Sequence, residues 1–190
     1  MTISGIVMKI YFAGPNVFHP KAKEMELLIT NYCRTLGVTP LIPGDSGIDW
    51  ANPDLPTIAR QIFTINRDHI INCDAVIANT TPFRGACIDD GTAWEIGFAA
   101  ALNKPVVTYA SGSAKTGETI EKFSGISSEY EQPRRDRDGY IIEEFGFQSN
   151  LMIACSTERH FYITSVWHES IIAAVAEPIH YLLAKRPISS

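Results

Sequence analysis

The sequence has no long apolar run and no basic surplus. No stretch approaches the ~18–20 residues that span a bilayer, and the N-terminus lacks the charged start and apolar core of a secretory signal. We therefore expect a cytoplasmic protein. The formal net charge of −5 disfavours nucleic acid and membrane surfaces as partners. With 45% hydrophobic residues, the 190-residue chain is too apolar to be disordered and has the length of one domain, residues 1–190, with an N-terminal extension at 1–7.

Patterns that bind metals or nucleotide cofactors are also missing. The four cysteines occur singly, without a C-x-x-C pair or a histidine at ligand spacing, so we expect reduced, mostly buried thiols. Neither G-x-G-x-x-G nor G-x-x-x-x-G-K-[ST] occurs, which removes most of the support for NAD or ATP chemistry. We expect no metal site and no cofactor.

The first two-thirds of the chain alternates between short β-type runs and helical stripes. The predicted strands are residues 9–13, 39–42, 75–78 and 105–109, with a further one at 160–163. The predicted helices are residues 21–36, 57–72, 92–102 and about 169–185. Pro178 should kink or interrupt the last helix. This alternation predicts an α/β fold, a doubly wound (flavodoxin-like) parallel sheet of about five strands with helices on both faces.

A sheet of this kind binds ligands at the carboxyl ends of its strands, where the strand order reverses. That rule points to residues 14–19, 43–50 and 79–90. Residues 111–149 are predicted to form a loop region, in which arginines at 134, 135 and 137 are interleaved with aspartates. Such a cluster is usually a solvated loop, but a loop of this length is unusual in a compact domain. It is therefore either a functional flap or contains a short element, for which residues 141–147 are the candidate.

The densest chemical feature is DDGTAWEIGFA at residues 89–99. Thr92-x-x-Glu95 matches a capping box, in which the threonine caps a helix and the glutamate reaches back to its first amide. Three carboxylates at one helix start exceed what a cap needs, and a helix N-terminus favours an ionised carboxylate. Glu95 could therefore be an anionic nucleophile with a second carboxyl as proton donor, as in retaining glycosidases. Both interpretations remain open.

Two further segments have both a structural and a functional interpretation. Asp68 lies beside the apolar stripe of its predicted helix, either as a solvated residue or as the second carboxyl. At the end of the first strand, Tyr11 and Phe12 could stack a planar base, and Gly14 would let a ligand approach the backbone. An ordinary buried strand followed by a turn accounts for the same residues.

Five segments together resemble one family, the nucleoside 2-deoxyribosyltransferases. They are KIYFAGP (9–15), NRD (66–68), CDAVIA (73–78), DDGTAWEIGFAAALNKPVV (89–107) and FQSNLMI (147–153), in family order over three-quarters of the chain. Members of the family move a 2-deoxyribosyl group from one nucleobase to another. The implied partners are 2′-deoxynucleosides and free nucleobases, with no cofactor.

The resemblance assigns a role to each candidate side chain. It implies that Glu95 attacks C1′ to form a covalent deoxyribosyl-glutamate, that Tyr11 orients this glutamate, and that Asp68 protonates the departing base. Asp89 matches the aspartate that holds a sugar hydroxyl. Two successive inversions at C1′ would give retention of configuration and ping-pong kinetics.

The resemblance also implies a homo-oligomer. Asn150 and Met152 match a pair that a neighbouring subunit supplies to the site, and the family commonly assembles dimers into hexamers. Three features depart from the family pattern: Asp90, the loop at residues 82–87, and residues 1–7. The insert before Asn150, the variable loop region at 111–149, also differs among family members.

Two alternatives use the same scaffold. A 2′-deoxynucleoside 5′-monophosphate N-glycosidase would replace the acceptor base with water and would need phosphate donors, typically serines and an arginine near the first loop. Residues 14–19 contain neither. A non-catalytic nucleotide-sensing module has no need of a nucleophile, so the joint presence of Glu95, Asp68 and Asp89 argues against it.

Overall fold

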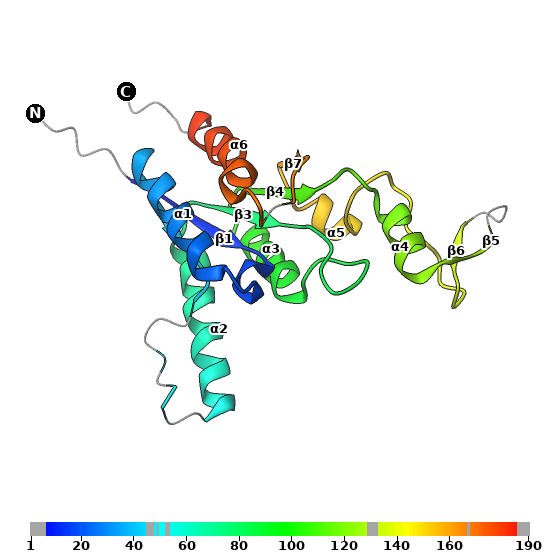
Figure 1. Cartoon of the computed structure of the whole chain (residues 1–190), viewed down its shortest axis with the longest axis horizontal. Helices are drawn as coiled ribbons and strands as arrows, with labels where there is room; N and C mark the ends of the chain where they lie inside the picture. The colour runs from blue at the N-terminus through cyan, green and yellow to red at the C-terminus, as the bar shows by residue number, and fades with distance from the viewer. Residues whose placement is uncertain are drawn as a thin grey trace, which may run out of the picture.

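The structure is a computed structural model whose middle layer is a sheet of five parallel strands (Figure 1). It describes residues 7–44, 48, 50–51, 54–128, 133–166 and 168–185, so most of the predicted extension at 1–7 lies outside it. The strands are β1 (Met8–Ala13), β2 (Val38–Leu41), β3 (Ala75–Asn79), β4 (Val106–Ser111) and β7 (Arg159–Ile163). Their order, β2-β1-β3-β4-β7, confirms the predicted doubly wound α/β fold and reverses between β1 and β3.

Two pairs of long helices cover the two faces of the sheet. They are α1 (Ala22–Thr35) with α6 (Ile171–Ala184), and α2 (Leu55–Asn72) with α3 (Asp90–Ala101). Met8, Ile10 and Phe12 of β1 belong to the core under α1 and α6, whereas Tyr11 and Ala13 belong to the core under α2 and α3. Successive residues of a strand point to opposite faces, so β1 contributes to both cores.

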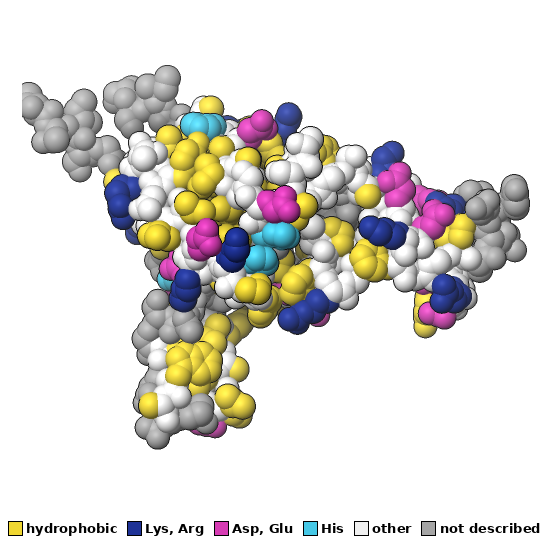
Figure 2. All heavy atoms as spheres, viewed as in Figure 1, with side chains coloured by type: hydrophobic (Ala, Val, Ile, Leu, Met, Phe, Trp, Pro, Cys, Tyr) yellow, Lys and Arg dark blue, Asp and Glu magenta, His cyan; other side chains and the backbone are white. Residues whose placement is uncertain are grey.

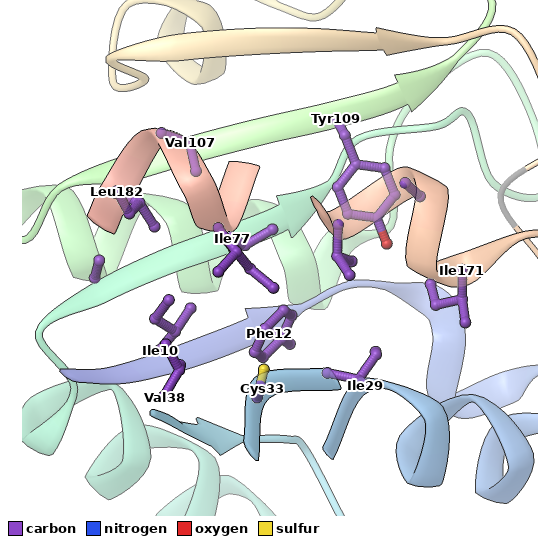
Figure 3. Packing of buried hydrophobic residues seen from close by; sticks show 14 of the residues in the cluster. Ile10, Phe12, Ile29, Cys33, Val38, Ile77, Val107, Tyr109, Ile171 and Leu182 are labelled. Atoms are coloured by element: carbon purple, nitrogen blue, oxygen red, sulfur yellow. The ribbon is translucent and has the colours of Figure 1, made fainter. Parts of the chain in front are cut away.

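The core under α1 and α6 is the larger of the two. Figure 3 shows Ile10 and Phe12 of β1 with Ile29 and Cys33 of α1, all buried in this cluster. Of the kink or interruption predicted at Pro178, the interruption does not occur, since α6 continues through that residue. Proline costs a helix interior about 3 kcal/mol. Burying a large aliphatic side chain stabilises by about 1.5–3 kcal/mol, and α6 buries four of them along its apolar stripe: Ile171, Val175, Ile179 and Leu182.

The described residues of 111–149 form an arm that extends away from the sheet (Figure 1). The region contains short elements, as one of the two expectations had it, but the predicted place at residues 141–147 is wrong. The arm instead contains α4 (Thr116–Ser124), β5 (Ile126–Ser128) and β6 (Arg135–Asp136), and Ile141 makes only an isolated bridge to Arg135. Few of the nine residues of α4 are apolar, so no helical stripe marked it in the sequence.

Ion pairs brace the arm. The Arg134 guanidinium donates to Glu121 at 2.9 Å and to Glu144 at 2.7 Å, joining α4 to the chain that returns to the sheet. Figure 2 shows basic and acidic side chains mixed along the arm, so its described residues form no patch of one sign on that face.

The cysteines are divided between the interior and the surface. All four cysteines are free thiols, but only Cys33 and Cys73 are buried, whereas Cys87 and Cys155 are exposed. The expectation of mostly buried thiols therefore holds for half of them.

Among the described helices, none combines the length and the apolar character needed to cross a membrane.

Candidate active site

A buried phenol–carboxylate pair joins the sheet to α3. Tyr11 of β1 is fully buried, and its hydroxyl donates to Oε1 of Glu95 at 2.5 Å. Glu95 is only 9% exposed and comes from the second turn of α3, 84 residues further along the chain. Strand parity explains the meeting, because Tyr11 and Ala13 face α3 while their neighbours face α1.

The cap of α3 differs from the predicted capping box. The helix starts at Asp90, and Asp89 is its N-cap. Oδ2 of Asp89 accepts the backbone N–H of Thr92 at 2.9 Å and the Thr92 hydroxyl at 3.0 Å. Since Asp89 satisfies the helix start, Glu95 is not needed there and points to Tyr11 instead. Asp90, unexplained in the sequence, is an exposed acidic residue in the first helical turn, where negative charge is favourable.

The electrostatics of Glu95 also differ from expectation. Burial raises its pKa from the ordinary 4.5 to about 7; the hydrogen bond from Tyr11 opposes this rise, and the charge of Asp89 adds to it. The helix dipole was expected to favour the ionised form. Its effect falls off within the first turn, and Glu95 lies beyond that turn.

Asp68 lies on α2, which packs against β1 and α3. Its Oδ1 accepts two hydrogen bonds from Arg67, at 2.9 and 2.7 Å, and both side chains are partly exposed. The next residue, His69, places its ring centroid 6.3 Å from that of Tyr11. Burial lowers the pKa of His69, and its Nδ1 is buried with no hydrogen-bond partner among the described residues. Asp68 is therefore the chain neighbour of a residue whose ring lies beside Tyr11.

Gly14 lies where the strand order reverses, and its backbone conformation requires glycine. Its φ is +151°, and an added Cβ would be 2.8 Å from Cβ of Asn79 at the end of β3. Asn79 donates to Oδ1 of Asn16 at 3.0 Å, and Asn16 donates to the Tyr109 hydroxyl at 3.4 Å. These side chains tie together the carboxyl ends of β1, β3 and β4. Sequence reasoning missed Asn16 and Asn79, because polar residues after a strand are common in turns.

Phe12 does not lie where base stacking would require. It is 7% exposed and packs in the core under α1 and α6, on the face of β1 opposite Tyr11. The expectation that both aromatic residues of this strand face a ligand is wrong for Phe12, because adjacent strand residues point to opposite faces.

A second aromatic group, missed in the sequence, joins the loops that follow β1 and β3. The rings of Phe18 and Phe83 stack at 5.7 Å, and the Arg84 guanidinium lies 5.2 and 4.7 Å from their centroids. Arg84 has a positive φ of 54°, uncommon for a non-glycine residue. It makes no hydrogen bond or ion pair within the described part of the chain. No periodic pattern marks this contact, since its members are 65 residues apart.

Asn150 and Met152 belong to a short helix, α5 (Leu151–Ala154), which packs against α3. Asn150 caps α5 by accepting the N–H of Met152 at 3.0 Å, and its Nδ2 donates to Glu143 at 2.8 Å. Both residues are exposed, Met152 at 69%. Their polar groups contact neither Glu95 nor Asp89 within the described chain.

Fold and site together define an α/β protein of the flavodoxin-like type with a buried carboxylate–phenol pair near the carboxyl edge of its sheet. The chain belongs to the nucleoside 2-deoxyribosyltransferase family, whose model matches residues 10–152.

Three relatives illustrate the range of similarity. An uncharacterized protein of Schizosaccharomyces pombe is 30% identical over 156 residues, covering 75% of this chain and 74% of its own. The structure of a 2-desoxiribosyltransferase from Leishmania mexicana is 31% identical with a TM-score of 0.63, covering 92% of this chain and 98% of its own. A conserved protein from Enterococcus faecalis V583, 19% identical with a TM-score of 0.51 over 91% of this chain and 99% of its own, shares the fold.

Proposed function

We propose that this protein exchanges the base of 2′-deoxynucleosides through a covalent deoxyribosyl intermediate on Glu95. The observation that carries the proposal is the buried hydrogen bond of 2.5 Å between Tyr11 and Glu95. A carboxylate in this setting is held in one orientation and is shielded from water, as a nucleophile at a sugar carbon requires. Membership of the family and the similarity to the Leishmania mexicana enzyme support this activity.

The proposed chemistry has two half-reactions. In the first, the free oxygen of Glu95 attacks C1′, and the electron pair of the N-glycosidic bond passes to the base, which takes a proton from Asp68. In the second, a nitrogen of the incoming base attacks C1′, the glutamate leaves as a carboxylate, and Asp68 takes the proton back. Each step inverts C1′, so the product keeps the configuration of the substrate.

Tyr11 and Asp89 have supporting roles in this scheme. Burial and the neighbouring Glu95 raise the pKa of Tyr11, so the phenol stays protonated and donates to Oε1 of the glutamate. That leaves Oε2 as the attacking atom. Asp89 uses Oδ2 for its two bonds to Thr92, so Oδ1 is left to accept a sugar hydroxyl.

The N-glycosidase alternative is tested in the same experiment. The first loop contains no serine or arginine, but Arg84 packs against Phe18 of that loop and could face an anion there. Incubating deoxyinosine with adenine should give deoxyadenosine and hypoxanthine, measured by liquid chromatography. A parallel reaction with deoxyinosine 5′-monophosphate should be slower. Free deoxyribose as the main product with adenine in excess, or preferred cleavage of the monophosphate, would favour the hydrolase and overturn the proposal.

The pH dependence of exchange should report on Glu95. Because the ionised carboxylate is the nucleophile, the limb of the kcat/KM profile that Glu95 sets should rise about tenfold per pH unit below the pKa of about 7. Replacing Tyr11 with phenylalanine removes a hydrogen bond that lowers this pKa, so the rising limb should move to higher pH. Rates over pH 5–9 for both proteins test this. An unchanged limb in Tyr11→Phe would argue against Glu95 as the titrating group.

Asn150 and Met152 are proposed to complete the site of a neighbouring copy, since both are exposed and engage neither Glu95 nor Asp89 in their own chain. The active species should therefore be a homo-oligomer. Sedimentation velocity at assay concentrations, combined with rates over a dilution series, should show activity falling as the oligomer dissociates. A fully active monomer would exclude a shared site.

A further inference from the structure

Glu143, which no sequence motif marked, holds the segment that carries Asn150. Its Oε2 accepts a hydrogen bond from Nδ2 of Asn150 at 2.8 Å, and its Oε1 accepts the backbone N–H of Leu151 at 2.5 Å. One carboxylate thus binds the side chain of the helix cap and the first amide of α5. In Figure 1, α5 lies between α3 and the arm, and Glu143 comes from the chain that returns from the arm.

These contacts determine the orientation of the Asn150 amide. Its oxygen faces the N–H of Met152, and its nitrogen faces the Glu143 carboxylate. Turning the amide by 180° would place its NH₂ group against the Met152 N–H and its oxygen against the Glu143 carboxylate, so only one orientation fits. A primary amide nitrogen carries two hydrogens, and Glu143 accepts one of them. Among the described residues none accepts the second hydrogen of Asn150, which is therefore left on an exposed side chain.

We infer that Glu143 is a positioning residue that orients Asn150 to donate a hydrogen bond to a substrate hydroxyl; this rests on the proposed function of Asn150. Its negative charge strengthens the two bonds that it accepts, because hydrogen bonds to an ionised group are roughly twice as strong as neutral ones. The role requires a carboxylate. A glutamine at this position has one oxygen, so either Asn150 or Leu151 would face an N–H group.

The neighbouring residue Glu144 provides a matched control. It has the same side chain, is exposed where Glu143 is half-buried, and pairs with Arg134 at 2.7 Å rather than with α5. Removing Glu144 therefore loosens the arm without touching Asn150. A general weakening of the arm would affect both glutamate variants, whereas loss of amide orientation would affect only Glu143.

A double-mutant cycle tests the inference. Glu143→Ala and Glu143→Gln should each raise KM for deoxyinosine about five- to twentyfold, with kcat less affected. Asn150→Ala should raise KM further. The double variant Glu143→Ala with Asn150→Ala should have the same KM as Asn150→Ala alone. Glu144→Ala should stay within about twofold of the parent. The dissociation constant for deoxyinosine in a Glu95→Gln background, measured by calorimetry, should follow the same pattern.

Each outcome is decisive. Equal effects of the Glu143 and Glu144 variants, additive effects in the cycle, or an unaffected Glu143→Gln would overturn the inference while leaving base exchange intact. If the Glu143 and Asn150 substitutions are non-additive in deoxyinosine binding but the parent exchanges no base, the proposed function fails and the positioning role stands. If no coupling appears in binding, the positioning role fails regardless of activity. Because the two Glu143 variants differ in volume, a folding defect in one still leaves the other to decide.

Discussion

Glu95→Gln should reduce base exchange by roughly 10⁴-fold or more, the range that removal of a catalytic nucleophile costs. The amide has nearly the shape of the carboxylate and can still accept the Tyr11 hydrogen bond, so the packing around the pair should remain intact. It has no anionic oxygen to attack C1′. Initial rates with deoxyinosine and adenine, measured at pH 8 where the parent carboxylate is ionised, give the comparison.

The stability of the same variant provides the control for folding. The folded-state pKa of Glu95 lies near 7, above its ordinary 4.5, so its contribution to stability is present below pH 4.5 and is lost as pH rises through 7. Over that window the parent should lose up to about 3 kcal/mol from this group, since each pKa unit corresponds to about 1.36 kcal/mol. Glu95→Gln has no ionisable group at this position and lacks this loss. Its free energy of unfolding in urea, compared with that of the parent, should therefore increase with pH.

Two observations would contradict the role of Glu95. Exchange near the parent rate in Glu95→Gln would exclude it as the nucleophile. So would the absence of a deoxyribosyl adduct on the peptide containing Glu95 when the parent is quenched with deoxyinosine and analysed by mass spectrometry.

Asp68→Asn should lower kcat by about 10²–10³-fold, the contribution typical of a general acid. In the parent, Arg67 donates two hydrogen bonds to Oδ1 of Asp68, and the asparagine keeps an oxygen that can accept them. The asparagine has no acidic proton to give to the departing base. The loss should depend on the base. A deoxynucleoside of 7-methylguanine already carries a positive charge on its base and needs no protonation, so Asp68→Asn should cleave it at close to the parent rate.

A matched aspartate variant completes this experiment. Asp90 is exposed at the first turn of α3, and Asp90→Asn should stay within about twofold of the parent on both substrates. If Asp68→Asn lost the same factor on the charged and the neutral base, Asp68 would not be the proton donor. Its position near Tyr11, through His69, would then serve binding rather than chemistry.

The sequence predicted the layers of this molecule because hydrophobic periodicity reflects burial directly. The strands 9–13 and 75–78 were each within a residue or two of β1 and β3. The start of α3 was less accurate, since both Asp89 and Thr92 are good caps, and the choice between them depends on which side chain reaches which amide. That depends in turn on Glu95 having a partner 84 residues away.

The site was predicted by resemblance more than by local pattern. Tyr11 and Phe12 are adjacent aromatics in one strand, and the sequence alone does not say which of them faces α3. The contacts of Phe18 with Arg84, and of Glu143 with Asn150, join loops rather than periodic elements, so no spacing rule reports them. The pKa of Glu95 depends on burial by surrounding chain, which is a tertiary property.

Asp89 illustrates a constraint on how this scaffold can diverge. One of its oxygens starts α3 through Thr92, and the other is proposed to hold a sugar hydroxyl. Loss of a helix cap costs about 0.5–2 kcal/mol. Selection for a stable helix and selection for sugar recognition therefore act on the same side chain. Serine or threonine would keep the cap but give up the charged acceptor, so a descendant that changes its sugar keeps this helix start only if it chooses among the few residue types that cap.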